Sequence, residues 1–308
     1  MKIFSSIYDF QTQGKTVLTL GTFDGVHLGH QSILKKLEKA SDELNCESLV
    51  LTFFPHPRMV LQQDGDIKLL NTIDEKAELL RKFGVDNLIV HPFDNRFSQL
   101  SAEEFVSEIL VKQFNIAKII IGYDHRFGKN RSATIDDLIV FGEKYGFEVE
   151  QISAKEIDEV SVSSTKIRVA LDNGDITTAN SYLGYKYSFS GKVVQGKQLG
   201  RTIGFPTANI QIAEDYKLIP KIGVYVVKAT YQGRTIGGMM NIGFKPTVDG
   251  IAKTIEVHLF DFKEDLYGTD LKIEVLHRLR DEQKFSSVDH LKEQLFQDKK
   301  LSLEYFAK

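Results

Sequence analysis

The sequence predicts a two-domain α/β protein, in which a doubly wound parallel sheet is followed by an antiparallel β-barrel with a terminal helix. The length of 308 residues suggests two domains, at roughly 150 residues per domain. Strand-like and helical runs alternate up to about residue 183. From residue 184 onward, strand-like runs follow one another without helical segments between them. We therefore expect one domain over 1–183 and a second over 184–308.

The strands predicted in the first domain are short and almost entirely apolar, and amphipathic helical stretches over 30–44 and 72–84 separate some of them. This alternation is typical of a parallel sheet that helices cover on both faces. Thr72 followed by Glu75, and Ser101 followed by Glu104, predict capping boxes at two helix starts. The predicted strands are 16–20, 48–53, 87–92, 117–122 and 147–152.

Two short helical stretches, 162–171 and 175–183, close the first domain. Consecutive strand-like runs with glycine-containing turns then predict an antiparallel sheet closed as a small barrel. A last helix follows, with Val288, Leu291 and Leu295 on one face. The runs predicted as barrel strands are 187–195, 205–212, 223–231, 235–243, 254–262 and 271–279.

Composition limits the classes of function. Hydrophobic residues make up 42% and charged residues 26%, as in ordinary globular proteins, and the net charge of −3 gives no global case for nucleic-acid binding. Cys46 is the only cysteine, so an intrachain disulfide is excluded and a reducing compartment fits best. We expect a soluble cytoplasmic protein that binds small molecules, with no nucleic-acid or membrane partner, and the sequence leaves the oligomeric state open.

The segment GTFDGVHLGH, 21–30, follows the first long strand and opens a helix. Its glycines let the backbone pass close to a ligand, and the helix N-terminus favours phosphate. His27 and His30 are three residues apart, so they share one face of the helix start and can donate hydrogen bonds to a phosphate. The alternative is a glycine-rich turn that carries two surface histidines.

The segment VSSTKIR, 162–168, gathers hydroxyl groups and cations at another predicted helix start. Hydroxyls and N-terminal amides bind phosphate oxygens, while Lys or Arg neutralises the charge of a transferring group. An N-capped surface helix is the alternative interpretation.

Together these two segments resemble the nucleotidylyltransferase superfamily, which pairs an HxGH motif with a later SSTxIR motif. TFFPHP at 52–57 and IGYDHRFGKNRS at 121–132 are similar to its FAD synthetase branch, although His125 stands where many members carry an aromatic residue. The resemblance implies transfer of an adenylyl group from ATP to FMN, with His27 and His30 acting on the ATP phosphates. The nucleotide pocket that it implies comprises Phe23, Gly25, His56, Asp124, Arg126, Ser163, Ser164, Thr165 and Arg168.

A second candidate site begins at the glycine-rich segment 196–210, GKQLGRTIGFPTANI. Gly196, Lys197 and Gly204 belong to a plausible phosphate loop, although a flexible hairpin has the same composition. Thr207 and Asn209 are two apart, so in a strand they point the same way. Their oxygens suit Mg²⁺ beside substrate phosphates, whereas the alternative is a cross-strand hydrogen-bonding pair.

Glu256 lies in a strand in which Ile255, Val257 and Leu259 alternate with polar or aromatic residues. The aliphatic residues should face the core, which leaves Glu256 on the other face, available for chemistry or for solvent.

The second half as a whole is similar to the riboflavin kinase family, in GKVVQGKQLGRTIGFPTANI, NIGFKPT, EVHLFDFKEDLYG and LRDEQKF. The resemblance implies that Thr207 and Asn209 bind Mg²⁺-ATP and that Glu256 is the general base on the ribityl hydroxyl. Arg280 is a weaker candidate for a phosphate contact. The order of the two modules resembles bacterial bifunctional flavin-synthesising enzymes, with ATP, riboflavin, FMN and FAD as substrates or products. Two alternatives are an adenylyltransferase for another phosphorylated acceptor with an accessory barrel, and a flavin sensor that no longer turns over.

Overall fold

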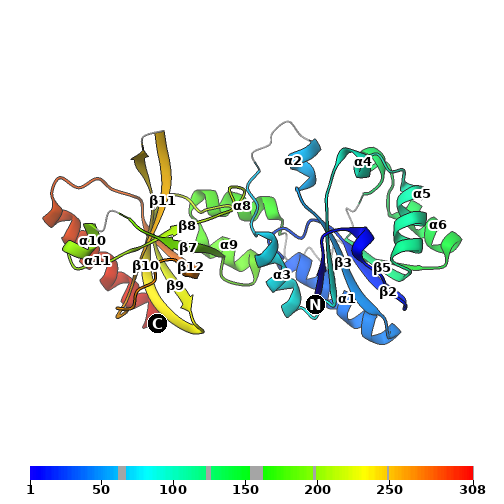
Figure 1. Cartoon of the computed structure of the whole chain (residues 1–308), viewed down its shortest axis with the longest axis horizontal. Helices are drawn as coiled ribbons and strands as arrows, with labels where there is room; N and C mark the ends of the chain where they lie inside the picture. The colour runs from blue at the N-terminus through cyan, green and yellow to red at the C-terminus, as the bar shows by residue number, and fades with distance from the viewer. Residues whose placement is uncertain (62–66, 123–125, 153–161, 197–198, 248–249, 308) are drawn as a thin grey trace. The chain divides into compact units, whose positions relative to one another are not determined.

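The computed structural model describes residues 1–61, 67–122, 126–152, 162–196, 199–247 and 250–307 (Figure 1). The chain divides into two compact units, Met1–Ser164 and Thr165–Lys308. Among the described residues, no helix is long and apolar enough to cross a membrane.

The first unit contains a six-stranded parallel sheet in the order β1-β4-β3-β2-β5-β6. Its strands are β1 (Lys2–Phe4), β2 (Thr16–Leu20), β3 (Glu47–Phe53), β4 (Asn87–His91), β5 (Ile116–Gly122) and β6 (Glu148–Ile152). Its helices are η1 (Ile7–Asp9), α1 (Leu28–Leu44), α2 (Pro57–Leu61), α3 (Ile73–Lys82), α4 (Asn95–Ser98), α5 (Ala102–Glu104), η2 (Phe105–Gln113), η3 (Lys129–Arg131) and α6 (Ile135–Tyr145). The doubly wound parallel sheet predicted from the sequence is confirmed.

Two apolar cores lie on opposite faces of this sheet, because successive strand residues point to opposite sides. Val17, Val50 and Leu88 pack with Leu34 of α1 and Leu80 of α3. On the other face, strand residues pack with η2 and α6, and this core comprises Leu18, Leu49, Ile89, Ile119, Val106, Leu110 and Leu138 among others.

β2 is the strand at which the order of the sheet reverses, since β3 pairs with it on one side and β5 on the other. In open α/β sheets, ligands bind in the crevice at the carboxyl ends of the strands, beside this reversal. The segment 21–27 leaves β2 at that end and leads into α1. The topology therefore positions the HxGH segment where such sheets bind ligands.

The second unit is a closed antiparallel barrel in the order β10-β11-β8-β7-β12-β9, followed by a terminal helix, and both predictions are confirmed. Its strands are β7 (Ser188–Val194), β8 (Ala208–Gln211), β9 (Gly223–Tyr231), β10 (Arg234–Thr247), β11 (Gly250–Leu259) and β12 (Asp270–Arg280). Its helices are α8 (Ser164–Asn173), which begins one residue before the unit, α9 (Ile176–Leu183), α10 (Leu199–Thr202) and α11 (Val288–Phe306).

Helices α8 and α9 group with the barrel, whereas the sequence analysis assigned residues up to 183 to the first domain. Specific hydrogen bonds account for this. The Leu171 carbonyl accepts from the Lys221 amide at 3.0 Å. The side-chain amide of Asn180 donates from Nδ2 to the Val275 carbonyl at 3.0 Å, and its Oδ1 accepts from the backbone amide of Tyr187 at 2.6 Å. The position at which the chain can be cut into functional halves stays a prediction, to which we return below.

Candidate active sites

The segment between β2 and α1 forms the first candidate site. His27 is the N-cap of α1, and its Nδ1 accepts a hydrogen bond from the His30 amide at 3.4 Å. The two imidazole rings stack with centroids 3.7 Å apart and planes inclined by 17°. The ring of Phe23 lies 5.0 Å from that of His30. The two histidines of the predicted motif therefore form one stacked pair at a helix N-terminus.

Both imidazoles are held in the neutral form. Burial lowers the pKa of His27 from 6.5 to about 4. Burial, and then the charges of His27 and Lys76, lower the pKa of His30 well below its usual value. Because Nδ1 of His27 accepts a hydrogen bond, its proton resides on Nε2, which leaves an N–H donor on the other side of the ring. The pair is suited to donating neutral hydrogen bonds to an anion.

Asp24 anchors the centre of this segment. Its Oδ1 accepts from the Leu70 amide at 2.9 Å and from the Asn71 amide at 3.4 Å. Its carbonyl accepts from the Ser164 hydroxyl at 2.8 Å. One residue of the predicted SSTxIR motif is thus bonded directly to the HxGH segment.

The other predicted residues of the first site are distributed as follows. His56 is buried next to α2, and its Nδ1 accepts from the Arg58 amide at 3.1 Å. Arg126 is exposed just beyond β5, and Asp124 lies outside the described residues. Phe23 and Gly25 lie in the segment after β2, Ser163 precedes α8, and Thr165 and Arg168 lie on α8 in the second unit.

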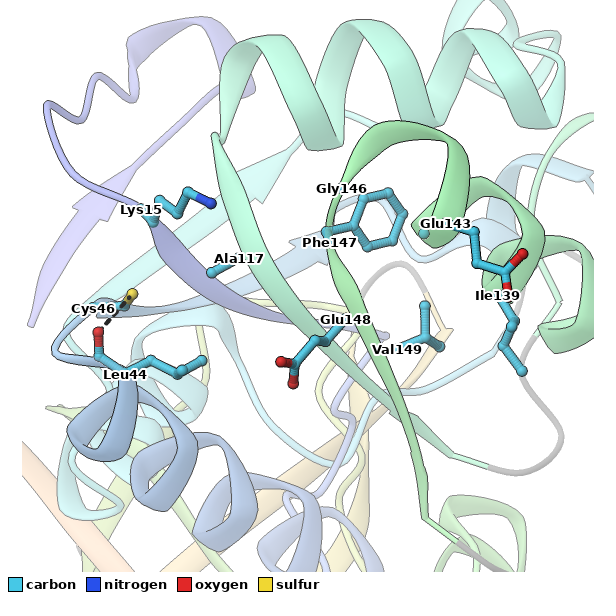
Figure 2. A pocket seen from close by; sticks show the side chains of 11 residues that line it. Lys15, Leu44, Cys46, Ala117, Ile139, Glu143, Gly146, Phe147, Glu148 and Val149 are labelled. Carbon is cyan, nitrogen blue, oxygen red and sulfur yellow. Dashed lines mark hydrogen bonds between the residues drawn. The ribbon is translucent and has the colours of Figure 1, made fainter.

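A separate cavity of about 680 Å³ lies at the amino-terminal ends of the strands, where β2, β5 and β6 begin (Figure 2). Lys15, Cys46 and Glu148 lie around it, and the Cys46 thiol donates to the Leu44 carbonyl at 3.4 Å. None of the residues predicted for either site lines this cavity.

The second candidate site lies in the barrel. The backbone register places Glu256 of β11 opposite Asn209 of β8 on one side and Asn241 of β10 on the other. Residues opposite one another on adjacent strands share a face of the sheet. The Thr207 hydroxyl donates to Glu256 Oε2 at 3.4 Å. The predicted Thr, Asn and Glu are therefore brought together, with Asn241 as a further polar neighbour.

These residues line a cavity of about 300 Å³. Its lining includes the polar residues Thr207, Asn209 and Glu256 and the apolar residues Ile203, Phe205, Phe285, Leu291 and Leu295. Leu291 and Leu295 come from α11, while Val288 at the first turn of that helix is 53% exposed. The cavity lining thus combines apolar side chains with hydrogen-bonding and charged groups.

Arg280 reaches the same cavity but is held by a carboxylate. Its Nε lies 2.9 Å from Asp298 Oδ1, and its Nη2 lies 2.7 Å from Asp298 Oδ2. Asp298 lies on α11 and is fully buried, and Gln294 also donates to it at 2.9 Å. The Arg280 guanidinium is thus held in the lining of the cavity by the terminal helix.

The glycine-rich segment before β8 approaches Asn209, which lines the cavity. Gly196 packs against Asn209 so closely that a Cβ there would overlap the amide of Asn209. Gly204 has a φ of 85°, a conformation that glycine adopts most readily. Lys197 lies outside the described residues.

In comparisons with known proteins, the two halves of the chain match two different families. The model of the FAD synthetase family matches residues 9–166, and that of the riboflavin kinase family matches residues 183–306. The bifunctional riboflavin kinase/FMN adenylyltransferase of Listeria monocytogenes is 40% identical to the chain and covers 97% of it, with 95% of that protein covered. The Escherichia coli protein of the same name is 37% identical, covering 100% of the chain and 98% of that protein.

The chain belongs to the bifunctional riboflavin kinase/FMN adenylyltransferase family. A solved structure from Streptococcus pneumoniae, described as a macrolide-efflux protein, has the same fold over 98% of both chains, with a TM-score of 0.89 and 33% identity. Both motif resemblances found in the sequence, FAD synthetase first and riboflavin kinase second, are confirmed by the two family matches.

Sequence reasoning missed several residues of the two sites. In the FAD synthetase unit these are Asp24, inside the quoted motif but without an assigned role, and Lys76, a single lysine on an amphipathic helix. In the riboflavin kinase unit, Asn241 and Asp298 line the cavity. His258 Nδ1 also lies 2.8 Å from the Pro206 carbonyl, just before Thr207. The regular i, i+2 spacing of Glu256 and His258 was the one available signal.

Proposed function

We propose that this chain makes flavin cofactors in two steps at two separate sites. The riboflavin kinase unit transfers the γ-phosphoryl group of ATP to riboflavin, which gives FMN and ADP. The FAD synthetase unit then transfers the adenylyl group of a second ATP to FMN, which gives FAD and pyrophosphate. The observation that carries this proposal is that each half of the chain matches one family, with the His27–His30 pair in the first unit and the Thr207–Glu256 pair in the second.

For the kinase step, we assign Glu256 as the general base. A neutral alcohol attacks phosphorus more readily when its proton is accepted during the attack, and Glu256 lies in the cavity beside Thr207 and Asn209. The apolar residues of the cavity would contact the isoalloxazine ring, which leaves the ribityl chain to the polar residues. Arg280, held by Asp298, would contact phosphate.

Thr207 and Asn209 are the candidates for binding Mg²⁺ together with ATP. A hydroxyl and an amide oxygen are hard ligands of the kind that Mg²⁺ accepts when phosphates supply the remaining positions, and the Glu256 carboxylate adjoins them. When bound, the ion would neutralise charge on the phosphates. Gly196 lets the backbone of the preceding segment approach Asn209. With Lys197 and Gly204, it would contact the ATP phosphates.

For the adenylyl step, we assign His27 and His30 to the ATP phosphates. The FMN phosphate is already an anion, so its attack on the α-phosphorus requires no base, and positioning and hydrogen bonding carry the catalysis. Neutral imidazoles at a helix N-terminus can supply such hydrogen bonds. We propose that the nucleotide and flavin pocket is completed by Phe23, Gly25, His56, Asp124, Arg126, Ser163, Ser164, Thr165 and Arg168.

A pair of variants tests the two-site proposal. The purified chain is incubated with Mg²⁺-ATP and either riboflavin or FMN, and the flavins are separated by chromatography. We expect His30→Ala to slow FAD formation by roughly 10²–10³, the scale for losing one transition-state donor, and to leave FMN formation unchanged. Glu256→Gln should slow FMN formation by about 10²–10⁴ and leave FAD formation from FMN unchanged. Loss of both activities in either folded variant would contradict separate sites.

A further inference from the structure

Lys76 is a buried cation beside the first site that none of the quoted motifs contains. It lies on α3 and is 3% exposed. Its Nζ donates to the Thr22 carbonyl at 2.7 Å and lies 3.4 Å from the Thr52 hydroxyl at the end of β3. The Thr52 hydroxyl also donates to the Thr22 carbonyl, at 3.1 Å. Lys76 thus links α3 and β3 to the start of the HxGH segment.

This position is costly for an ammonium group. Burial lowers the pKa of Lys76 from 10.5 to about 8, and the nearby Asp24 carboxylate only partly opposes that effect. An apolar residue of similar length would fill the same space without the desolvation cost of a charge. The burial of a lysine here therefore calls for a role other than packing.

The segment that Lys76 contacts has an unfavourable backbone conformation. Phe23, Gly25 and Val26 have φ angles of 46°, 86° and 37°. Positive φ is uncommon for residues other than glycine, and it is least favourable for β-branched residues such as Val26. Such conformations persist only where the surrounding contacts impose them.

Contacts on alternate residues impose the conformation of this segment. Lys76 binds the carbonyl of Thr22. The Asp24 carboxylate binds two amides before α3. Gln31 Nε2 binds the Val26 carbonyl at 2.9 Å. The segment then ends at His27 and the stacked imidazole pair. Lys76 is the contact nearest to the sheet and the one that bears a positive charge.

We propose that Lys76 is a positioning residue for adenylyl transfer, which holds the Gly21–His27 segment so that the two imidazoles meet the ATP phosphates. This inference rests on the proposed function of the first site. It also assigns a role to Asp24, which binds the amides before α3 and whose negative charge partly offsets the effect of burial on the pKa of Lys76.

The test compares Lys76→Met with Lys82→Met in the full chain. Lys82 is an exposed residue of the same helix, so its variant controls for loss of a charge on α3. We expect Lys76→Met to lower kcat for FMN adenylylation by about tenfold to hundredfold, with a smaller change in the KM for ATP, because a small displacement of reacting groups has effects of this size. Lys82→Met should have the same kcat and KM for FMN adenylylation as the wild-type protein, and both variants should phosphorylate riboflavin normally.

A second pair of variants covers the case in which Lys76→Met fails to fold. Thr52→Val removes one hydrogen-bonding partner of Lys76 without changing the side-chain volume much, and Thr52→Ser restores the hydroxyl. We expect a partial loss of kcat in the first and its recovery in the second. NMR signals of the His27 and His30 rings should shift in Lys76→Met and in Thr52→Val but not in Lys82→Met.

The outcomes separate the two hypotheses. If the unchanged chain forms no FAD, the proposed function of the first site is wrong, and the histidine signals still test the positioning by Lys76. If the unchanged chain forms FAD and folded Lys76→Met does so with the same kcat, Lys76 only stabilises the fold, and the positioning role is wrong.

Discussion

At the scale of single residues, the stacked pair of His27 and His30 has a structural role beside the chemical one that we propose. His27 caps α1 through Nδ1, which fixes the orientation of its ring and leaves the Nε2–H free to donate to an anion. Burial of the pair keeps both rings uncharged. The same burial has a consequence for stability, because a neutral histidine in the folded state resists protonation that the unfolded chain accepts.

We predict a stability that falls with acidification in a defined pH window. The pKa of His27 is about 4 in the folded chain and 6.5 in the unfolded chain. Between these values the unfolded state binds more protons, so the free energy of unfolding should fall as the pH drops from 6.5 to 4, by on the order of 3 kcal/mol from this residue. An NMR titration should place the His27 pKa near 4.

The variant His27→Asn isolates this contribution, since Asn is a good N-cap and does not titrate. Urea unfolding followed by circular dichroism at several pH values should show a weaker pH dependence in the variant than in the unchanged chain. An equal pH dependence in both would mean that His27 is protonated as readily in the folded state as in the unfolded one.

At the scale of elements, the terminal helix α11 completes the kinase cavity. Leu291 and Leu295 supply apolar lining, and Asp298 holds the Arg280 guanidinium in the same lining. Arg280 stands at the end of β12, so this ion pair joins the last strand of the barrel to the last helix. The helix therefore lines the candidate site and also packs on the barrel.

We predict that Asp298→Asn destabilises the barrel and weakens substrate binding there. Removing one partner of a buried ion pair leaves the other uncompensated and costs about 3–5 kcal/mol. The KM for ATP or riboflavin should rise, because Arg280 would no longer be held at the cavity. Asp289→Asn, at an exposed position in the first turn of the same helix, is the matched control and should change neither quantity. Equal unfolding midpoints in the two variants would argue against a structural role for the Arg280–Asp298 pair.

At the scale of the whole molecule, the chain consists of two compact units, and each half carries the motifs of one family. Most of α8 and α9 lies between the stretches that match the two families, 9–166 and 183–306. The buried residues of these helices include Ile167, Leu171, Ile176, Ala179 and Leu183. Their hydrogen bonds to Tyr187, Lys221 and Val275 make them a support for the barrel.

Comparing two cut positions tests where the functional halves meet. The sequence predicts that fragments 1–183 and 184–308 fold separately, the first converting FMN to FAD and the second riboflavin to FMN. From the contacts of α8 and α9, we expect 165–308 to be an active kinase with a higher melting temperature than 184–308. In the full chain, Asn180→Ala should lower the melting temperature of the barrel, since it removes both hydrogen bonds of that amide. If 184–308 melts no lower than 165–308, the two helices do not support the barrel.

Much of the fold could be read from the sequence, because local patterns mark each element. The apolar runs at 16–20 and 223–231 match β2 and β9 over their whole length. The capping boxes at Thr72 and Ser101 are present in the structure. The strand Lys2–Phe4 was missed, since three residues are too few for a periodic pattern, and a third capping box at Thr134 went unrecognised because Asp137 replaces the usual Glu.

The alternation in β11 shows where local pattern reaches its limit. Ile255, Val257 and Leu259 face the core as predicted, but His258 and Phe260 on the other side are also buried. The second face is covered because Phe260 packs with Phe205 and Met239, and with Leu295 and Phe306 of the distant α11. A period of two distinguishes the faces of a strand, whereas only the rest of the chain decides what covers each face.

The sequence by itself determined the order of the two modules, the periodicity of their elements and the motifs that name their families, because these depend on residues near one another in the chain. Tertiary structure alone decided which distant residues lie beside each candidate site. Lys76 reaches Thr22 across 54 positions, and Asp24 meets Ser164 across 140. The Arg280–Asp298 pair and the row Asn209–Glu256–Asn241 likewise join segments that strand pairing and helix packing bring together. The physical reason is that a hydrogen bond or an ion pair depends on distance in space, which spacing along the chain predicts within one helix or strand but not between distant segments.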